Sequence, residues 1–396
     1  MSHPPARQRR LRAAGLAGLV VLLAACGDER QDIFTPEGSY ARKINNLQVP
    51  VFVIAGVVGV GVAVGLAYVL LQGHKRAQGD DDPRQLEGNF KLEIGWTIGP
   101  AVLLAGVAVA TVATLFAIED NPADAGQFEA MEITVYGHQW WWGYEYELDG
   151  DTGNGAEIVT ANDLVIPAGV PITLNITSRD VIHSFWIPAL NGTRDAVPGR
   201  VHTLNIEADA PGIFDGQCKE FCGLSHANMQ QRVVALSEAD FADWLDQQQE
   251  DQPMLAVGEE GAEGEPGSAG QQSFIGRCSQ CHQVNGLEDE EGEPIVVEGE
   301  AALVSGYAPN LTHLMSRGVY AGGLFELYDE NGEFDRDTLE AWLRNAPAEK
   351  PMYTEPESGD PRGMPNLGLS EDEIDDLIEY LQTLGDPPPL QTPTED

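Results

Sequence analysis

The sequence predicts a multidomain membrane protein in three parts: a two-helix transmembrane hairpin, an all-β sandwich and a small all-α unit. Two uncharged runs, at about residues 49–71 and 96–118, are as long as the roughly 20 residues that a membrane-spanning helix needs. Short β-type segments separated by Gly, Pro, Asn and Asp follow from Met131, a pattern typical of sandwiches and barrels. A length of 396 residues allows two or three folding units.

Composition restricts the class of partner. The formal net charge of −41 at pH 7 argues against nucleic acid, because phosphate binding needs clustered Lys and Arg. The cysteines are Cys26, Cys218, Cys222, Cys278 and Cys281. The last four form two close pairs, each followed by a His, so metal or haem attachment is favoured over a disulfide framework.

The N-terminus is typical of an exported protein. Residues 1–25 carry four arginines and then an apolar run that is too short to span a bilayer, which predicts a signal peptide. The run ends in Leu-Ala-Ala-Cys and resembles a bacterial lipoprotein box, so Cys26 would become the lipidated start of an exported segment over residues 26–48. An uncleaved anchor with an inert Cys26 is the alternative.

The hairpin is predicted over residues 49–118, with both of its ends outside the cytoplasm. The segment between its helices is rich in positive charge, which by the positive-inside bias places it in the cytoplasm. Everything after Glu119 is then extracytoplasmic. Glu93 lies near the start of the second helix, where on sequence alone a carboxylate serves to offset the helix dipole.

The sandwich strands are predicted at residues 133–137, 157–159, 171–177, 202–206 and 232–236. Residues 137–146 are predicted as one aromatic strand in which Trp140, Trp142, Tyr144 and Tyr146 share a face and Trp141 lies on the other. Most of these rings are expected to pack in the core or at the membrane interface. One of them is a candidate surface landing point for electrons.

One short segment carries a concentrated set of metal ligands. Cys218 and Cys222 could bridge two metal ions, while His226 and Met229 follow at once, and thiolate and thioether beside imidazole select copper. The site needs a second imidazole, for which His183 is the candidate. A disulfide, a tetrahedral zinc site and an ordinary strand role for His183 are the alternatives, and Met229 favours copper.

The pattern Cys-x-Glu-x-Cys-x-x-x-His-x-x-Met at residues 218–229 resembles subunit II of the haem-copper cytochrome c oxidases, over about residues 40–245. The resemblance implies a cupredoxin-like domain at residues 125–248 that holds the binuclear copper centre CuA. It implies that Cys218 and Cys222 bridge the coppers. The remaining ligands would be His183 and His226 at the two ends, Met229 as the weak ligand, and Glu220 through its backbone carbonyl.

The same resemblance gives roles to weaker signals. Glu93, three residues before Trp96, matches a carboxylate at a proton-path entrance, and electrons would enter the copper centre through Trp140. Residues 195–200 match a segment that faces the catalytic subunit, where the Glu220 carboxylate resembles a magnesium ligand. Trp141 and Gly143 depart from the usual residues of the family, which puts the details of docking in doubt.

A second metal-binding unit follows an acidic linker. Residues 249–268 are rich in Glu, Gly and Gln and have no apolar period, which predicts a flexible tether. Cys278-Ser-Gln-Cys281-His282 is then a c-type haem attachment signal, in which two thiols bond the porphyrin and His282 ligates iron. A redox-active or zinc-binding Cys-x-x-Cys is the alternative. The unit spans residues 269–385 and is followed by a tail at 386–396.

Met364 is the predicted sixth ligand of the haem iron. It precedes a helix whose start is predicted by a capping box of Ser370 and Glu373. A thioether ligand raises the haem potential. Met352 and Met315 are its rivals, and His313 is expected in a loop or near the propionates. The unit resembles class I cytochromes c, and its position resembles the caa-type oxidases. The acidic insert at residues 287–300 is expected to be a solvated loop.

These features predict an electron relay in a bacterial inner membrane. Electrons would pass from the fused haem c to CuA and then to a catalytic oxidase subunit I that reduces oxygen to water with proton translocation. Subunit III and an upstream cytochrome or quinol-cytochrome c reductase are further expected partners. A CuA-type nitric oxide reductase subunit and a membrane-anchored copper carrier are the alternatives. A quinol oxidase subunit II is excluded because it would lack the metal ligands.

Overall fold

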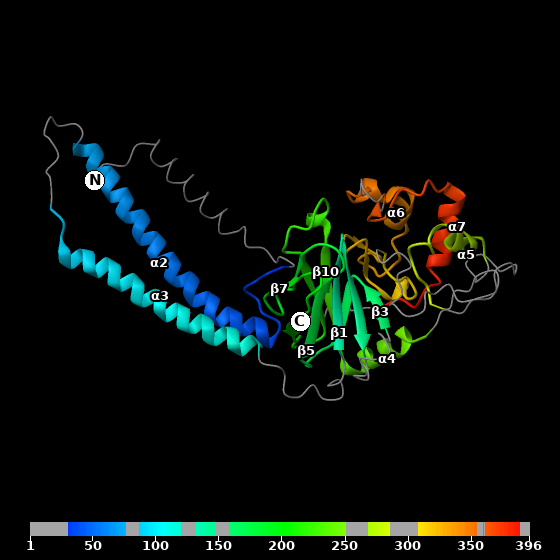
Figure 1. The fold of residues 1–396 in the computed structure, drawn as a ribbon, viewed down its shortest axis with the longest axis horizontal. Helices are drawn as coiled ribbons and strands as arrows, with labels where there is room; N and C mark the ends of the chain where they lie inside the picture. The colour runs from blue at the N-terminus through cyan, green and yellow to red at the C-terminus, as the bar shows by residue number, and fades with distance from the viewer. Residues whose placement is uncertain are drawn as a thin grey trace, which may run out of the picture.

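The computed structural model describes residues 31–76, 87–119, 132–147, 158–250, 268–285, 308–354, 359 and 361–388. The predicted signal peptide, Cys26, most of the acidic linker, the acidic insert and most of the tail lie outside these residues. The described part contains a helical hairpin, a β-sandwich and a helical unit, as predicted. We refer to the sandwich with helix α4 as the copper unit and to residues 268–388 as the haem unit (Figure 1).

Two long helices, α2 (Ser39–Arg76) and α3 (Phe90–Glu119), run away from the sandwich as a pair (Figure 1). Both are long and apolar enough to cross a membrane, and none of their most apolar stretches is buried within the protein. Helix α2 begins ten residues before the predicted span because its first turn packs on the sandwich. There the Ala41 N–H donates to the Leu190 carbonyl at 3.1 Å, and Arg42 pairs with Asp209.

The sandwich consists of a five-stranded sheet in the order β3-β2-β1-β5-β8 and a three-stranded sheet in the order β4-β10-β9, with the hairpin β6-β7 beside them. Strand β5 shows the alternation that builds it, since Ile172, Leu174 and Ile176 are buried and the residues between them are half-buried. The strands are β1 (Glu132–His138), β2 (Trp141–Glu147), β3 (Ile158–Ala161), β4 (Asp163–Pro167), β5 (Ile172–Ser178), β6 (His183–Trp186), β7 (Thr193–Ala196), β8 (His202–Ile206), β9 (Gly212–Gln217) and β10 (Gln230–Leu236).

The aromatic segment is not one strand. Strand β1 ends at His138, the chain turns at Gln139 and Trp140, and β2 returns antiparallel with His138 opposite Trp141. Trp142, Tyr144 and Tyr146 do share a fully buried face. The prediction for Trp140 is wrong because the chain turns at Gln139 and Trp140, which breaks the period of two on which the shared face was based.

Helix α4 (Glu238–Gln248) closes one end of the sandwich and buries Phe241 and Trp244, as its apolar pattern predicts. The haem unit contains α5 (Ala269–Arg277), α6 (Arg336–Glu349), α7 (Glu371–Leu381) and the short strand pairs β11 (Val319–Tyr320) with β12 (Phe325–Glu326) and β13 (Tyr353–Thr354) with β14 (Pro361–Arg362). The Ser370–Glu373 capping box is confirmed at the start of α7. Gly270 lets α5 approach α7, because a Cβ there would lie 2.0 Å from the Asp376 carbonyl oxygen.

The haem unit packs directly on the copper unit (Figure 1). The Gln230 N–H donates to the Gly322 carbonyl at 2.9 Å, and the Gly318 N–H donates to the Asp163 carboxylate at 2.6 Å. Buried Arg232 pairs with Asp163 in its own unit and with Glu326 across the interface. Met352 touches both hydrophobic cores. The two cofactor regions therefore lie in one packed body.

Candidate metal centre and haem pocket

The first site lies between strand β6 and the loop that follows β9. Fully buried His183 begins β6, and Cys218 and Cys222 come from the loop. One ligand atom from each of these residues lies within 4.8 Å of the others. The two sulfurs are 3.8 Å apart, and the Cys218 sulfur lies 3.9 Å from His183 Nδ1. Residues 35 positions apart thus meet because β6 runs beside the loop.

The remaining candidate ligands surround the same two sulfurs. His226 Nδ1 and Met229 Sδ lie 3.6 and 3.8 Å from the Cys222 sulfur, and the Glu220 carbonyl oxygen lies 3.2 Å from the Cys218 sulfur. A tetrahedral zinc site uses four ligands, whereas six donors converge here. This larger, soft donor set fits a pair of copper ions.

The disulfide alternative does not hold in this structure. Both cysteines are free, and their separation of 3.8 Å is almost twice the ~2.05 Å length of a disulfide bond. The pKa of Cys218 is lowered because the neighbouring Cys222 thiol and the His183 ring favour its thiolate, and the pKa of Cys222 is raised because Cys218 ionises first. Cys218 and Cys222 would both hold a metal ion as thiolates, since a ligating thiol must lose its proton.

A carboxylate orients the His183 ring. His183 Nε2 lies 2.8 Å from Asp180 Oδ1, which leaves Nδ1 directed at the Cys218 sulfur. Burial opposes protonation of His183, but its contacts with Asp180 and Cys218 raise the pKa of the ring above its ordinary value. Burial likewise opposes ionisation of Asp180, and the bond from His183 still holds its pKa below the ordinary value. Such a carboxylate fixes the tautomer of a ligating imidazole.

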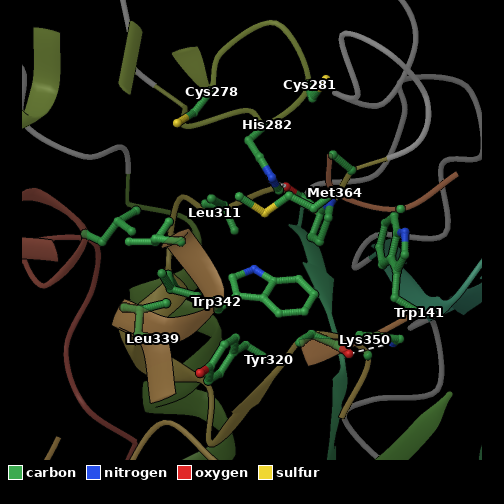
Figure 2. A pocket seen from close by; sticks show the side chains of 18 of the residues that line it. Trp141, Cys278, Cys281, His282, Leu311, Tyr320, Leu339, Trp342, Lys350 and Met364 are labelled. Atoms are coloured by element: carbon green, nitrogen blue, oxygen red, sulfur yellow. Dashed lines mark hydrogen bonds between the residues drawn. The ribbon is translucent and has the colours of Figure 1, made fainter. Parts of the chain in front are cut away.

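The second site is a cavity of about 400 Å³ on the interface side of the haem unit. Cys278, Cys281 and His282 lie on one side of it (Figure 2). The ring of His282 makes a bond of 2.8 Å from Nδ1 to the Pro309 carbonyl, so that Nδ1 carries the proton and Nε2 keeps its lone pair. Burial lowers the pKa of His282, which keeps the ring neutral as an iron ligand requires. An apolar cavity with a Cys-x-x-Cys-His wall fits a covalent haem.

The structure separates the candidate sixth ligands. Met364 and Met352 both line the cavity, and Figure 2 shows Met364 among the side chains of its wall. Met315 is buried in the core of the haem unit and does not line the cavity. His313 is also buried away from it, at the start of the 3₁₀ turn Leu314–Ser316. Met364 therefore keeps its place as the proposed ligand, with Met352 as its one described rival at the cavity.

Trp140 is not a surface landing point, because only 2% of it is exposed. Its indole N–H donates to the Cys222 carbonyl at 3.2 Å, and its ring lies 5.9 Å from that of Tyr353 in the haem unit. Trp140 and Trp141 both line the haem cavity. The residue whose indole bonds to the copper-ligand loop thus also lines the haem cavity.

Sequence reasoning missed several residues that shape these sites. Asp180 precedes His183 by three residues, and a carboxylate that close to a candidate ligand is a usable signal. Lys350 is the only lysine after Lys219, yet it is buried and donates to the Trp140 carbonyl at 2.7 Å. Nothing in the sequence shows that Lys350 lies between two units, because that placement depends on how they dock.

Three weaker candidates are exposed at the surface. Glu93 is exposed in the first turn of α3. Residues 195–200 comprise the end of β7 and the largely exposed turn after it. The Glu220 side chain is exposed on the copper loop. The structure thus leaves each of them accessible to a neighbouring subunit.

Fold and sites together define a membrane-anchored, extracytoplasmic protein with a copper-type centre and a c-type haem pocket. Residues 131–236 match the family model for the periplasmic domain of cytochrome c oxidase subunit II, and residues 267–385 match that for cytochrome c. The cytochrome c oxidase subunit 2 of Alkalihalophilus pseudofirmus is 32% identical over 375 residues, which cover 93% of this chain and 95% of the relative. The chain belongs to the cytochrome c oxidase subunit 2 family.

Two further similar proteins are as follows. The cytochrome c oxidase subunit 2 of Bacillus subtilis is 29% identical over 93% of this chain and 96% of its own length. Among solved structures, the periplasmic domain of subunit II of cytochrome oxidase from Bradyrhizobium japonicum is 29% identical, with a TM-score of 0.28, over 32% of this chain and 96% of that one.

Proposed function

We propose that this chain is the electron-accepting subunit II of a respiratory cytochrome c oxidase, in which a fused haem c passes electrons to a CuA centre. The haem and the copper pair supply the one-electron redox chemistry when bound, and the reduction of oxygen takes place on another subunit. Haem attachment is proposed through Cys278 and Cys281, with His282 and Met364 as axial ligands. Copper ligation is proposed through His183, Cys218, Glu220, Cys222, His226 and Met229.

One observation carries the proposal: Trp140 connects the two sites. Trp140 lines the haem cavity, and its indole N–H donates to the Cys222 carbonyl. Gln139 donates to the same carbonyl at 2.6 Å, which fixes the turn against the copper loop. This continuous contact supports Trp140 as the residue through which electrons enter the copper centre, with no bimolecular encounter between donor and acceptor.

The buried copper site weighs against a copper carrier. His183, Cys218, Cys222 and Met229 are each at most 3% exposed, and only His226 among the side-chain ligands is half-buried. A carrier must release its ion to a partner, and this requires ligands that solvent or another protein can reach. Asp180 and the strands β6 and β9 hold the donors in place. This is expected of a redox centre that keeps its geometry in both oxidation states.

The side of the copper loop that the haem unit leaves uncovered suits a catalytic subunit. Phe221 and Leu224 are 77% and 59% exposed, and Val201 near the 195–200 segment is 63% exposed. The Phe221 ring also contacts that of His226 at 5.6 Å between centroids. Exposed apolar side chains at a ligand mark an interaction surface. We propose that oxidase subunit I binds here and that the Glu220 carboxylate holds a magnesium ion at this contact.

The remaining assignments follow from the family. We propose a bacterial inner membrane as the location, with α2 and α3 spanning it and a lipid on Cys26. Glu93 would mark a proton-path entrance on the cytoplasmic side. Subunit III and an upstream cytochrome or quinol-cytochrome c reductase are the proposed further partners.

Purification of the full tagged chain from membranes of a host with haem-maturation machinery tests this function. The expected product contains two coppers and one covalent haem per chain, shows a mixed-valence near-infrared band, and co-purifies with a catalytic subunit that consumes oxygen. A single exchangeable copper or a zinc ion, with no near-infrared band, would contradict the oxidase assignment and support a carrier.

A further inference from the structure

A short segment of the haem unit, residues 350–353, lies against the part of the copper unit that contains Trp140. It begins where helix α6 ends and runs into strand β13. Its first, second and fourth residues each contact the copper unit, and Met352, the third, touches both hydrophobic cores. We refer to residues 350–353 as the contact segment.

The first residue of the contact segment holds the backbone of Trp140. Lys350 is 2% exposed, and its Nζ donates to the Trp140 carbonyl at 2.7 Å and to the Ala321 carbonyl at 2.6 Å. One side chain thus joins a turn of each unit. Loss of a buried donor that serves two carbonyls is costly, because both lose that partner. The position of Trp140 relative to the haem unit therefore depends on Lys350.

A glycine lets the haem unit come this close to Trp140. Gly322 adopts a φ of +74°, and a Cβ there would lie 2.2 Å from the Trp140 carbonyl oxygen. The Gly322 carbonyl accepts the N–H of Gln230, the residue after Met229, at 2.9 Å. The turn at Gly322 therefore contacts the turn at Trp140 and the end of the copper-ligand loop together.

The last residue of the contact segment holds the ring of Trp140. The Tyr353 ring lies 5.9 Å from the Trp140 ring at an angle of 56°, within the range in which aromatic pairs attract each other. The same indole donates its N–H to the Cys222 carbonyl at 3.2 Å. Buried Ser225 of the copper loop donates its hydroxyl to the Pro351 carbonyl. The contact segment thus touches both the connecting side chain and the loop to which it connects.

We propose that Lys350 and Tyr353 are positioning residues for electron transfer through Trp140. Lys350 holds the carbonyl of Trp140, and Tyr353 holds its ring. The indole thereby keeps its bond to the Cys222 carbonyl at the wall of the haem cavity. Trp140 would mediate the passage of one electron from iron(II), which becomes iron(III), to the copper pair, and it would itself be neither oxidised nor protonated. This inference rests on the proposed function, because it needs that transfer to occur.

The test uses full chains with copper and covalent haem bound, in which a light flash reduces the haem. Lys350→Met and Tyr353→Leu each remove one contact to Trp140, and Tyr353 is 38% exposed, so its replacement should not disturb folding. Burial lowers the pKa of Lys350 to about 7. Rates are therefore measured at about pH 9, where the amine is neutral and Lys350→Met removes bonds but no charge.

We expect each substitution to slow the first-order transfer from haem to copper about threefold to tenfold, because small displacements of a positioned group cost rate steeply. A second readout does not depend on electron transfer. The ultraviolet resonance Raman band that reports hydrogen bonding of an indole N–H is assigned to Trp140 as the difference between each chain and its Trp140→Leu counterpart. This band should shift in both variants.

A double-mutant cycle separates positioning from docking. In Trp140→Leu the carbonyl of residue 140 remains, so Lys350 still joins the units, but the indole is absent. Lys350→Met and Tyr353→Leu should then cause no further loss of rate. A residue that only held the units together would slow transfer by the same factor in both backgrounds.

Gln248→Met is the matched control. Gln248 is buried and uncharged, and its Nε2 donates across the interface to the Ser316 hydroxyl at 2.9 Å, outside the contact segment. Its rate and Trp140 band should equal those of the parent. The inference is overturned if Lys350→Met and Tyr353→Leu keep the parent rate or the parent band, or if they slow transfer equally in the Trp140→Leu background. Absence of any haem-to-copper transfer in the parent would instead contradict the proposed function.

Discussion

The copper site and the haem pocket are built in different ways. Every proposed copper ligand comes from one unit, and His183, Cys218 and Cys222 are brought together by the strands of the sandwich. The haem pocket takes its ligands from the haem unit but part of its wall, Trp140, Trp141 and Asn162, from the copper unit.

This difference has a functional consequence. Copper binding needs only the folded sandwich, so it is expected to be independent of the haem. The surroundings of the haem depend on docking, so its properties are expected to respond to changes in the copper unit. Single substitutions in either unit test this asymmetry.

Cys222→Ser should abolish the binuclear copper centre. The Cys222 sulfur lies near His226, Met229 and Cys218, and a hydroxyl is a poor replacement for a bridging thiolate. Metal analysis and the near-infrared band measure the loss, whereas the haem attachment spectrum should not change. His202→Gln is the control, since the His202 ring bonds to the Asp195 carbonyl in the same unit and is not among the proposed copper ligands. Retention of two coppers in Cys222→Ser would refute the proposed bridge.

Met364→Ala should remove the thioether ligand of the haem and lower its midpoint potential, because a thioether axial ligand raises it. The thioether-to-iron charge-transfer band in the visible spectrum and a redox titration measure both effects. Met352→Ala is the matched comparison, because Met352 lines the same cavity. If Met352→Ala loses the band and Met364→Ala keeps it, then Met352 and not Met364 is the axial ligand.

Arg232→Met should destabilise the docked protein by about 3–5 kcal/mol, since it leaves Asp163 as a buried charge without its partner. The Arg232 Nε lies 2.6 Å from Asp163 Oδ1, and its Nη1 lies 3.0 Å from Glu326 Oε2 across the interface. A lower thermal midpoint measures the change. Arg344→Met, which breaks an exposed ion pair with Glu371, should leave that midpoint almost unchanged. Equal midpoints for both variants would show that the interface pair is unimportant.

Asp180→Asn should weaken copper binding about 10–100-fold, the usual effect of removing a carboxylate that orients a ligating imidazole. The contact at stake is the one between Asp180 Oδ1 and His183 Nε2 at 2.8 Å. Competition with a copper chelator measures the affinity. Because this bond lies wholly within the copper unit, the haem potential should remain that of the parent. If Asp180→Asn also shifts the haem potential, the copper site and the haem pocket are not independent in the way proposed.

The sequence predicted the parts of both sites that local motifs encode. Residues 218–229 and 278–282 carry their ligands at short fixed spacings, so their chemistry can be read without the fold. The capping box at Ser370 and the apolar stripe of α7 are equally local. The turn at Trp140 was missed, because neither of its two residues, Gln139 and Trp140, is a Gly or Pro that would signal a turn.

The interface was beyond prediction for a physical reason. Lys350, Gly322 and Trp140 are far apart in sequence, and each has an ordinary local context in a turn or at a helix end. Their common position depends on the docking of two folded units through contacts such as Gly318 with Asp163. No periodicity or spacing rule encodes such a contact.

The most direct test of the account is the rate of electron transfer from haem to copper within the full chain. After rapid photoreduction of the haem, the near-infrared copper band should bleach as the haem reoxidises, with one first-order rate that does not depend on protein concentration. Trp140→Leu should slow this rate at least about tenfold, or ~1.4 kcal/mol in the barrier. A rate proportional to protein concentration, or one unchanged in Trp140→Leu, would contradict transfer through the docked interface.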